Sequence, residues 1–204
     1  MAINLSKGQK INLQKTSSSS GLGEILVNLN WNSKPVNQGF LKGLFGGGSS
    51  GIDLDLGCLY ELTDGRKGAV QALGNAFGSL SNPPYISLDG DDRTGESIGG
   101  ENLRINGNMV SQIKRILVYT FIYEGVANWQ QADATVTIKY PGAEDIIVKM
   151  DTYNSSQTMC GLALFQNVNN ETFSVEKIVQ FYQGHQNLDR AYGWNMKWTP
   201  GKKD

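Results

Sequence analysis

The densest group of side chains that could do chemistry is an acidic, glycine-rich stretch from Ser87 to Ile105. Glycine adopts positive φ readily, so such a stretch can fold tightly and turn its oxygen atoms toward one centre. Like charges in a tight turn repel one another unless a cation lies among them, and Ca²⁺ accepts about six to eight oxygen ligands in a forgiving geometry. The stretch favours a calcium-binding loop, and a solvated acidic turn is the alternative. It contains Arg93 and the carboxylates Asp89, Asp91, Asp92, Glu96 and Glu101.

A second pair of carboxylates, Asp53 and Asp55, lies in an alternating run from Ile52 to Leu62. In an extended strand the apolar residues of this run share one face and the two aspartates share the other. Two such residues lie about 6.5–7 Å apart, close enough to share a cation with a neighbouring loop. The alternative is that both aspartates simply face solvent on the outer side of the strand.

The elements that must position these residues are predicted to be strands. Short apolar runs separated by turn residues dominate the chain, and helical periodicity is scarce apart from one turn at 110–113. We therefore expect an all-β fold, a two-sheet β-sandwich that forms a single domain over residues 1–204. The predicted strands cover residues 3–5, 11–13, 24–31, 52–62, 115–124, 134–140, 145–151, 158–168 and 172–182.

Residues 39–51 form a Gly/Ser-rich segment with four large apolar side chains. Gly46, Gly48 and Gly51 match the glycine spacing of a dinucleotide-binding loop, but that motif needs a helix after it and here a strand-like run follows. We expect a flexible surface loop. Its apolar residues could grip a protein partner, or could pack onto the domain itself.

The sequence carries no recognisable enzyme signature. The acidic stretch is not an EF-hand, because Arg93 and Thr94 occupy positions that require an oxygen ligand and a glycine. His185 is the one histidine in the chain, which excludes a multi-histidine zinc site, and no nucleophile motif accompanies it. Paired carboxylates can cleave glycosides, but a polar, glycine-rich loop suits a metal better than a tuned acid. The aromatic tail around Trp194 and Trp198 could stack a sugar or base, although core packing is the usual role.

Composition limits the cellular setting. The formal net charge is −1, so bulk electrostatics suggest neither nucleic acid nor an anionic membrane as partner. The first residues lack the apolar segment of a signal peptide, and no run is long enough to span a bilayer. We expect a cytoplasmic protein in which Cys58 and Cys160 are buried, reduced thiols.

Two sets of runs carry a resemblance to a known family. The first set is Leu5–Leu13, Leu29–Trp31, Asp53–Asp55 and Gly90–Glu96, and the second is Asp89–Gly95, Glu101–Asn106, Phe121–Trp129, Gly184–Asp189 and Ala191–Trp194. The first set resembles the TerD family of tellurium-resistance and stress proteins, and the second is similar to its TerA branch. The resemblance implies a β-sandwich that binds Ca²⁺ through an Asp-x-Asp strand and an acidic loop, in a tellurite, phage and colicin resistance system, with no enzymatic activity assigned.

The resemblance also nominates ligands and exposes one departure. Carried over position by position, the calcium ligands implied by the family are Asp53, Asp55, Asp91, Asp92 and Glu96.

Typical TerD members continue with Gly-Asp-Asp-Glu, where this chain has Gly99, Gly100, Glu101 and Asn102. Asp89 and Glu101 are then the candidate substitutes, and if the family has two sites, one is weakened or lost here.

Taken together, the sequence predicts a non-enzymatic, calcium-binding module that acts as a binding or scaffolding protein in a tellurite-resistance or stress-response system. Its expected partners are other proteins of that system, including a peripheral membrane complex. One alternative is a metal-dependent hydrolase that uses the acidic loop with Mg²⁺ or Mn²⁺. Another is a structural partner protein that uses residues 39–51 and needs no ion.

Overall fold

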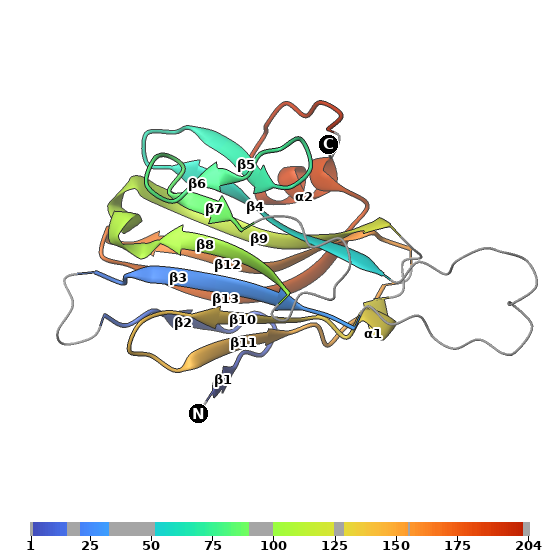
Figure 1. Cartoon of the computed structure of the whole chain (residues 1–204), viewed down its shortest axis with the longest axis horizontal. Coiled ribbons are helices and arrows are strands. Elements are labelled where there is room, and N and C mark those ends of the chain that lie inside the picture. The colour runs from blue at the N-terminus through green and yellow to red at the C-terminus, as the bar shows by residue number, and fades with distance from the viewer. Residues whose placement is uncertain are drawn as a thin grey trace, which may run out of the picture.

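The computed structural model describes residues 2–15, 21–32, 52–89, 100–124, 129–154 and 156–201. These residues form two β-sheets packed face to face, and the strand axes of the two sheets are nearly aligned (Figure 1). The prediction of an all-β sandwich is confirmed. The Gly/Ser-rich segment 39–51 lies outside the described residues.

The first sheet has seven strands in the spatial order β1-β11-β10-β3-β8-β7-β6 within the described chain. The strand β1 pairs with β11 in parallel, and the other pairings are antiparallel. Its strands are β1 (Ala2–Asn4), β3 (Glu24–Asn30), β6 (Gly78–Ser79), β7 (Ile86–Leu88), β8 (Glu101–Asn106), β10 (Thr135–Lys139) and β11 (Asp145–Lys149).

The second sheet has six strands in the order β2-β13-β12-β9-β4-β5, all antiparallel. Its strands are β2 (Lys10–Asn12), β4 (Asp53–Leu62), β5 (Lys67–Gln71), β9 (Ile113–Glu124), β12 (Met159–Val168) and β13 (Thr172–Tyr182). The remaining elements of the described residues are a 3-10 helix η2 (Gly107–Gln112) and the helices α1 (Trp129–Ala132) and α2 (His185–Tyr192).

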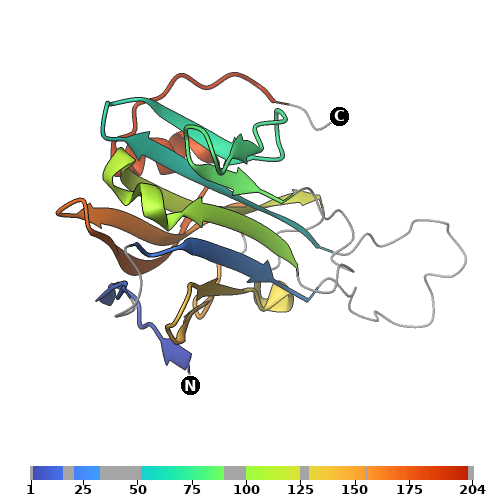
Figure 2. The ribbon, with the colours of Figure 1, turned by 60° about the vertical axis from the view of Figure 1, so that its left-hand side comes forward.

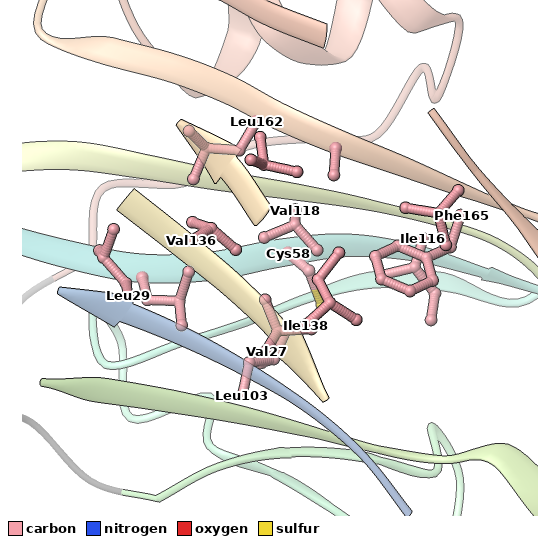
Figure 3. Close-up of a cluster of buried hydrophobic side chains, with 14 of the residues drawn as sticks. Val27, Leu29, Cys58, Leu103, Ile116, Val118, Val136, Ile138, Leu162 and Phe165 are labelled. Carbon is pink, nitrogen blue, oxygen red and sulfur yellow. The ribbon is translucent and has the colours of Figure 1, made fainter. Parts of the chain in front are cut away.

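The core between the sheets follows from alternation along each strand. In β3 the inward side chains Ile25, Val27 and Leu29 have no exposed surface, while the residues between them are half-buried. From the facing sheet, Val118 and Cys58 pack against this layer (Figure 3). The predicted strand register at residues 24–31 is therefore confirmed.

Strand β9 is buried on both faces, as its continuous apolar sequence predicts. Ile116 and Val118 point into the core between the sheets, whereas Leu117 and Tyr119 belong to a second apolar cluster on the outer face. Leu188 of α2 joins that second cluster. The sequence did not predict α2, which with the tail after it covers the outer face of this sheet.

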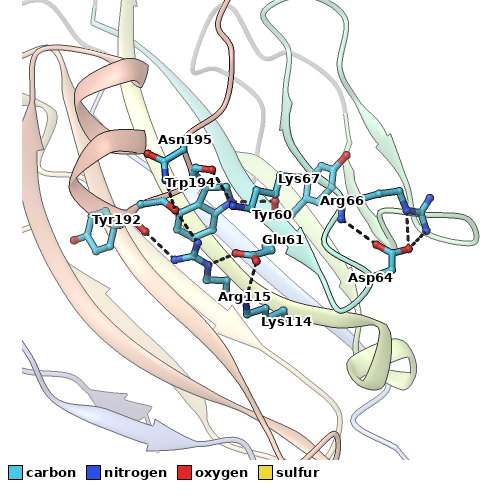
Figure 4. A network of polar contacts seen from close by, with 11 residues as sticks. Tyr60, Glu61, Asp64, Arg66, Lys67, Lys114, Arg115, Tyr192, Trp194 and Asn195 are labelled. Atoms are coloured by element: carbon cyan, nitrogen blue, oxygen red, sulfur yellow. Dashed lines mark hydrogen bonds and ion pairs between the residues drawn. The ribbon is translucent and has the colours of Figure 1, made fainter.

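A polar network fastens the C-terminal tail to the outer face (Figure 4). The Arg115 Nε atom donates to Glu61 Oε2 at 2.6 Å, and Arg115 Nη1 donates to the carbonyl of Tyr192 at 2.8 Å. The same guanidinium lies 3.7 Å from the ring centroid of Trp194, whose Nε1 donates to the carbonyl of Tyr60. One arginine thus links β9, β4 and the tail.

Glu61 is the anionic centre of this network. Burial alone would raise the pKa of its carboxyl, but hydrogen bonds from Lys114 and Arg115 outweigh burial and hold that pKa below its ordinary value of 4.5. The two cations differ in setting, because the Arg115 side chain is 22% exposed and the Lys114 side chain 59% exposed.

Arg115→Ala should lower the free energy of unfolding by about 2–4 kcal/mol, because it leaves Glu61 with one partner and releases the tail. Lys114→Ala is the matched control and should cost about 1 kcal/mol or less, since its bond to Glu61 is exposed to solvent. Urea denaturation at neutral pH measures both. Equal losses for the two variants would contradict this account of the network.

Glu61 also predicts a pH dependence. Because its folded pKa lies below 4.5, the unfolded chain takes up a proton first as the pH falls, so the stabilisation is complete above about pH 4.5 and is lost as the pH falls through the folded pKa. The stability difference between the wild type and Glu61→Gln should therefore shrink on acidification from pH 6 to pH 3. Thermal melting curves across that range test it, and a constant difference would refute it.

Among the described residues, none of the helices is long and apolar enough to cross a bilayer.

Candidate functional site

The two aspartates of β4 are buried rather than facing solvent. Asp53 is 8% exposed and Asp55 has no exposed surface. Asp55 pairs with Phe121 of β9, and both aspartates lie on the face opposite Leu54 and Leu56, which pack into the core between the sheets. The alternative of two solvated aspartates is therefore wrong for this strand.

The edge of β4 next to these aspartates is open to the other sheet. Strand β5 pairs only with Gly57–Glu61, so the backbone of residues 53–56 is not covered by β5. Glu101, the first residue of β8, reaches this edge from the facing sheet. Its Oε2 accepts a hydrogen bond from the Leu56 amide, the peptide nitrogen directly after Asp55. The Glu101 side chain belongs to the inward face of β8 and the residue is 2% exposed.

The structure therefore brings Glu101 to the strand that carries Asp53 and Asp55. Glu101 lies at the strand edge, and the aspartates lie on the adjoining outer face. Charged groups this deeply buried are normally paired or coordinate a metal ion. Within the described ranges, no three His, Cys, Asp or Glu side chains are grouped closely enough to hold a metal ion by themselves.

Asp89 is placed differently from Glu101. Its carboxylate accepts three hydrogen bonds from Arg104, from Nε to Oδ1 at 2.6 Å and to Oδ2 at 2.8 Å, and from Nη2 to Oδ2 at 2.6 Å. Arg104 also contacts Glu24, and the bonds to Asp89 and Glu24 raise the pKa of its guanidinium. Arg104 alternates with Leu103 and Ile105, so this ion pair lies on the outer face of β8, away from Glu101.

The backbones of Asp89 and Asn102 are nevertheless hydrogen-bonded to each other on either side of the acidic stretch. The Asp89 amide donates to the carbonyl of Asn102 at 3.0 Å, which closes the β7–β8 ladder. The stretch between them thus begins and ends beside Glu101. Asp91, Asp92 and Glu96 lie outside the described residues.

Sequence reasoning missed Arg104 as the partner of Asp89. A signal was present, since Arg104 is a cation at an outward position of an alternating strand that follows the acidic stretch. It also missed Tyr119, whose ring lies on the same outer face as Asp55. Burial, with smaller contributions from the charges of Cys58 and Asp55, raises the pKa of the Tyr119 hydroxyl well above its ordinary value.

Burial shifts the pKa values of both cysteine thiols and of the one histidine. Burial raises the pKa of the Cys58 thiol to about 12, and burial likewise raises the pKa of Cys160. Both thiols are free and buried, as the sequence predicts. Burial lowers the pKa of His185 to about 4. Its ring packs against Tyr119 and Phe121 at centroid distances of 5.4 and 5.0 Å.

Replacing Glu101 tests whether its carboxylate joins the two sheets. In a calcium-chelating buffer, Glu101→Ala should lower the free energy of unfolding by about 1–3 kcal/mol, because the buried Leu56 amide loses its acceptor. Glu101→Gln keeps an acceptor oxygen and should recover part of the loss.

Asp89→Ala is the matched control for Glu101→Ala. The side chains of its ion pair with Arg104 are about a third exposed, so its loss should cost about 1 kcal/mol or less. Urea denaturation compares the three variants, and a larger loss for Asp89→Ala than for Glu101→Ala would overturn the assignment.

Comparison with known proteins shows which sequences this chain is similar to. The family model of the TerD domain matches residues 1–140. Over 184 residues, the chain is 43% identical to the tellurium resistance protein TerA of Alcaligenes sp, covering 90% of this chain and 54% of that protein. It is 33% identical to the stress response protein SCP2 of Bacillus subtilis (strain 168), covering 64% of this chain and 65% of that one. The chain thus spans less than two thirds of the length of these relatives.

A solved structure gives the same fold. The homologue of telluride resistance protein (TerD), SCO6318 from Streptomyces coelicolor A3(2), superposes with a TM-score of 0.53 at 18% identity. The match covers 83% of this chain and 95% of that one. At this identity the likeness concerns the fold alone.

Proposed function

Because this chain belongs to the TerD family, we propose that it is a calcium-binding, non-enzymatic module of a tellurium-resistance or stress-response system. Its relatives are named as tellurium resistance and stress response proteins. The proposal for this chain adds the ion, its ligands and the way in which the ion acts.

The observation that carries the proposal is the burial of three carboxylates where β8 meets β4. Asp53, Asp55 and Glu101 are at most 8% exposed, and Glu101 accepts a hydrogen bond from the amide that follows Asp55. Buried carboxylates are costly unless a positive charge or several donors face them. Each of the three has an interaction within the protein, and a calcium ion would add to it, since its preference for oxygen ligands fits this donor set.

The acidic stretch supplies the remaining ligands in this proposal. Asp91 follows Asp89 by two residues, and a chain extends by at most about 3.6 Å per residue, so its backbone stays within about 7 Å of Asp89. In this proposal Asp91, Asp92 and Glu96 are the ligands that the stretch contributes. Asp89 is paired with Arg104, so in this proposal it anchors the start of the stretch and does not bind the ion.

Ion binding would act by ordering the surface. With calcium bound, the acidic stretch is neutralised and fixed against β4, and a protein partner can then recognise its shape. The protonated thiols and the neutral, ring-packed His185 support a role in binding rather than in catalysis. The partners we propose are other proteins of the same resistance system, in the cytoplasm or at the membrane periphery.

Calorimetric titration of chelator-treated protein tests the proposal. We expect Ca²⁺ to bind and to raise the melting temperature, and we expect Mg²⁺ to bind more weakly because it demands a smaller octahedral site. The double variant Asp91→Asn/Asp92→Asn, and separately Asp55→Asn, should abolish the calcium-dependent rise.

The control is Asp133→Asn, a surface aspartate with 59% of its side chain exposed and a positive φ that asparagine tolerates. It should keep the full calcium response. An unchanged response in the Asp91→Asn/Asp92→Asn and Asp55→Asn variants would reject these ligands. Turnover of phosphoesters or glycosides in the presence of Mg²⁺ or Mn²⁺ would favour a hydrolase instead.

A further inference from the structure

A second site lies away from the carboxylates, between β5 and the C-terminal tail. The cavity there has a volume of about 990 Å³, at the upper end of the range typical of small-molecule sites. Its walls come from β5 and the turn after it on one side, and from the start of α2 and residues 196–201 on the other. Figure 2 shows the tail running past β5 (red beside teal).

One wall of the cavity is a fixed pair of aromatic rings. The rings of Trp198 and His185 have centroids 5.1 Å apart. Trp198 Nε1 donates to Asp189 Oδ2 at 2.9 Å, and Asp189, itself 4% exposed, also accepts from the amides of Asn195 and Met196. The indole is therefore held in place before any ligand arrives.

The His185 ring is also fixed by a hydrogen bond. Its Nε2 lies 2.9 Å from Gln71 Oε1, and the Tyr119 hydroxyl donates to the same oxygen at 2.6 Å. The other end of that amide, Gln71 Nε2, donates to the carbonyl of Leu73. Because Gln71 Oε1 can only accept, the His185 proton is on Nε2 and its Nδ1 is left as an acceptor.

This chain of hydrogen bonds depends on one glycine. Gln71, Gly57 and Tyr119 are aligned across β5, β4 and β9. A Cβ atom on Gly57 would lie 2.7 Å from the Tyr119 ring, so glycine there lets the ring lie across β4 and reach Gln71. Gln71 lines the cavity, and it and its hydrogen-bond partner Tyr119 are 7% and 0% exposed.

The charge of the walls selects the ligand. Among the described lining residues the charged side chains are Lys67 and Lys197, and the side-chain amides of Gln186 and Asn187 add hydrogen-bonding groups. Lys67 Nζ donates to the carbonyl of Trp194, while Lys197 lies at an exposed position. The lining therefore combines positive charge, amide donors and aromatic surface.

We propose that this cavity binds a small phosphate ester that carries a ring, with the ring against Trp198 and the phosphate near Lys197. Nucleotides and sugar phosphates share this chemistry. An aromatic face stacks on either kind of ring, and a lysine at the mouth attracts the phosphate. The proposal is independent of calcium. The tail and α2 lie beyond residues 1–140, the part that the TerD domain model matches.

Calorimetric titration of the whole chain with adenosine monophosphate, glucose 6-phosphate and inorganic phosphate tests the proposal. At least one ring-bearing ester should bind roughly tenfold or more tightly than inorganic phosphate. Preference for adenosine monophosphate would identify a base as the ring, and preference for glucose 6-phosphate would identify a sugar. If neither ester binds at millimolar concentration, or if inorganic phosphate binds equally well, the proposal fails.

Variants locate the site. Lys197→Ala should weaken binding of the preferred ester several-fold, and Trp198→Ala should weaken it roughly tenfold or more. Lys139→Ala, an outward lysine of β10 with 53% of its side chain exposed, is the matched control and should leave binding unchanged.

Lys197 is exposed, so its variant stays folded even if Trp198→Ala is destabilised. Equal affinity in Lys197→Ala and Lys139→Ala would overturn the placement.

Discussion

The constraint on which the structure depends is that β4 is buried on both faces and still carries charge. Its inward side chains complete the core between the sheets, and its outer face is covered as well. A central strand of this kind is normally continuously apolar. Here Asp53 and Asp55 occupy two of its outer positions, and Glu101 closes on its backbone from the other sheet. The free energy of burying these groups must be balanced locally, and the Leu56 amide supplies part of that balance at Glu101.

The outer face of the same sheet also carries an apolar cluster that must be covered. The outer side chains of β9 and β4, among them Leu59, Leu117 and Tyr119, would be exposed without α2 and the tail. Arg115 and Glu61 fasten the tail over them. A cavity remains between the tail and β5. The protein thus has two candidate sites on one sheet. One lies at the carboxylates of β4 and the other under the C-terminal tail.

Much of the sandwich could be predicted from the sequence because its long strands alternate or are continuously apolar. Both strands at the N-terminus were also predictable, but not that the turn at Lys7 and Gly8 sends β1 and β2 into different sheets. Strand β8 was not predicted, because its first residue, Glu101, was grouped with the acidic stretch. Leu103 and Ile105 do alternate with polar residues, as in a strand. Helix α2 has only eight residues, so the helical spacing of Leu188 and Tyr192 is too short a pattern to stand out, and the glycine in a left-handed conformation that ends the helix, Gly193, is a second local signal.

The candidate sites were predictable to unequal degrees. Asp53, Asp55 and Glu101 could be nominated by charge and spacing, but the cavity could not, because its walls combine β5 with a tail more than a hundred positions away. A crystal structure of the protein grown in abundant calcium tests the central claim most directly. The account predicts a cation about 2.3–2.6 Å from oxygens of Asp53, Asp55 or Glu101 and of the acidic stretch. Carboxylates that are satisfied by protein donors alone, with no ion among them, would contradict it.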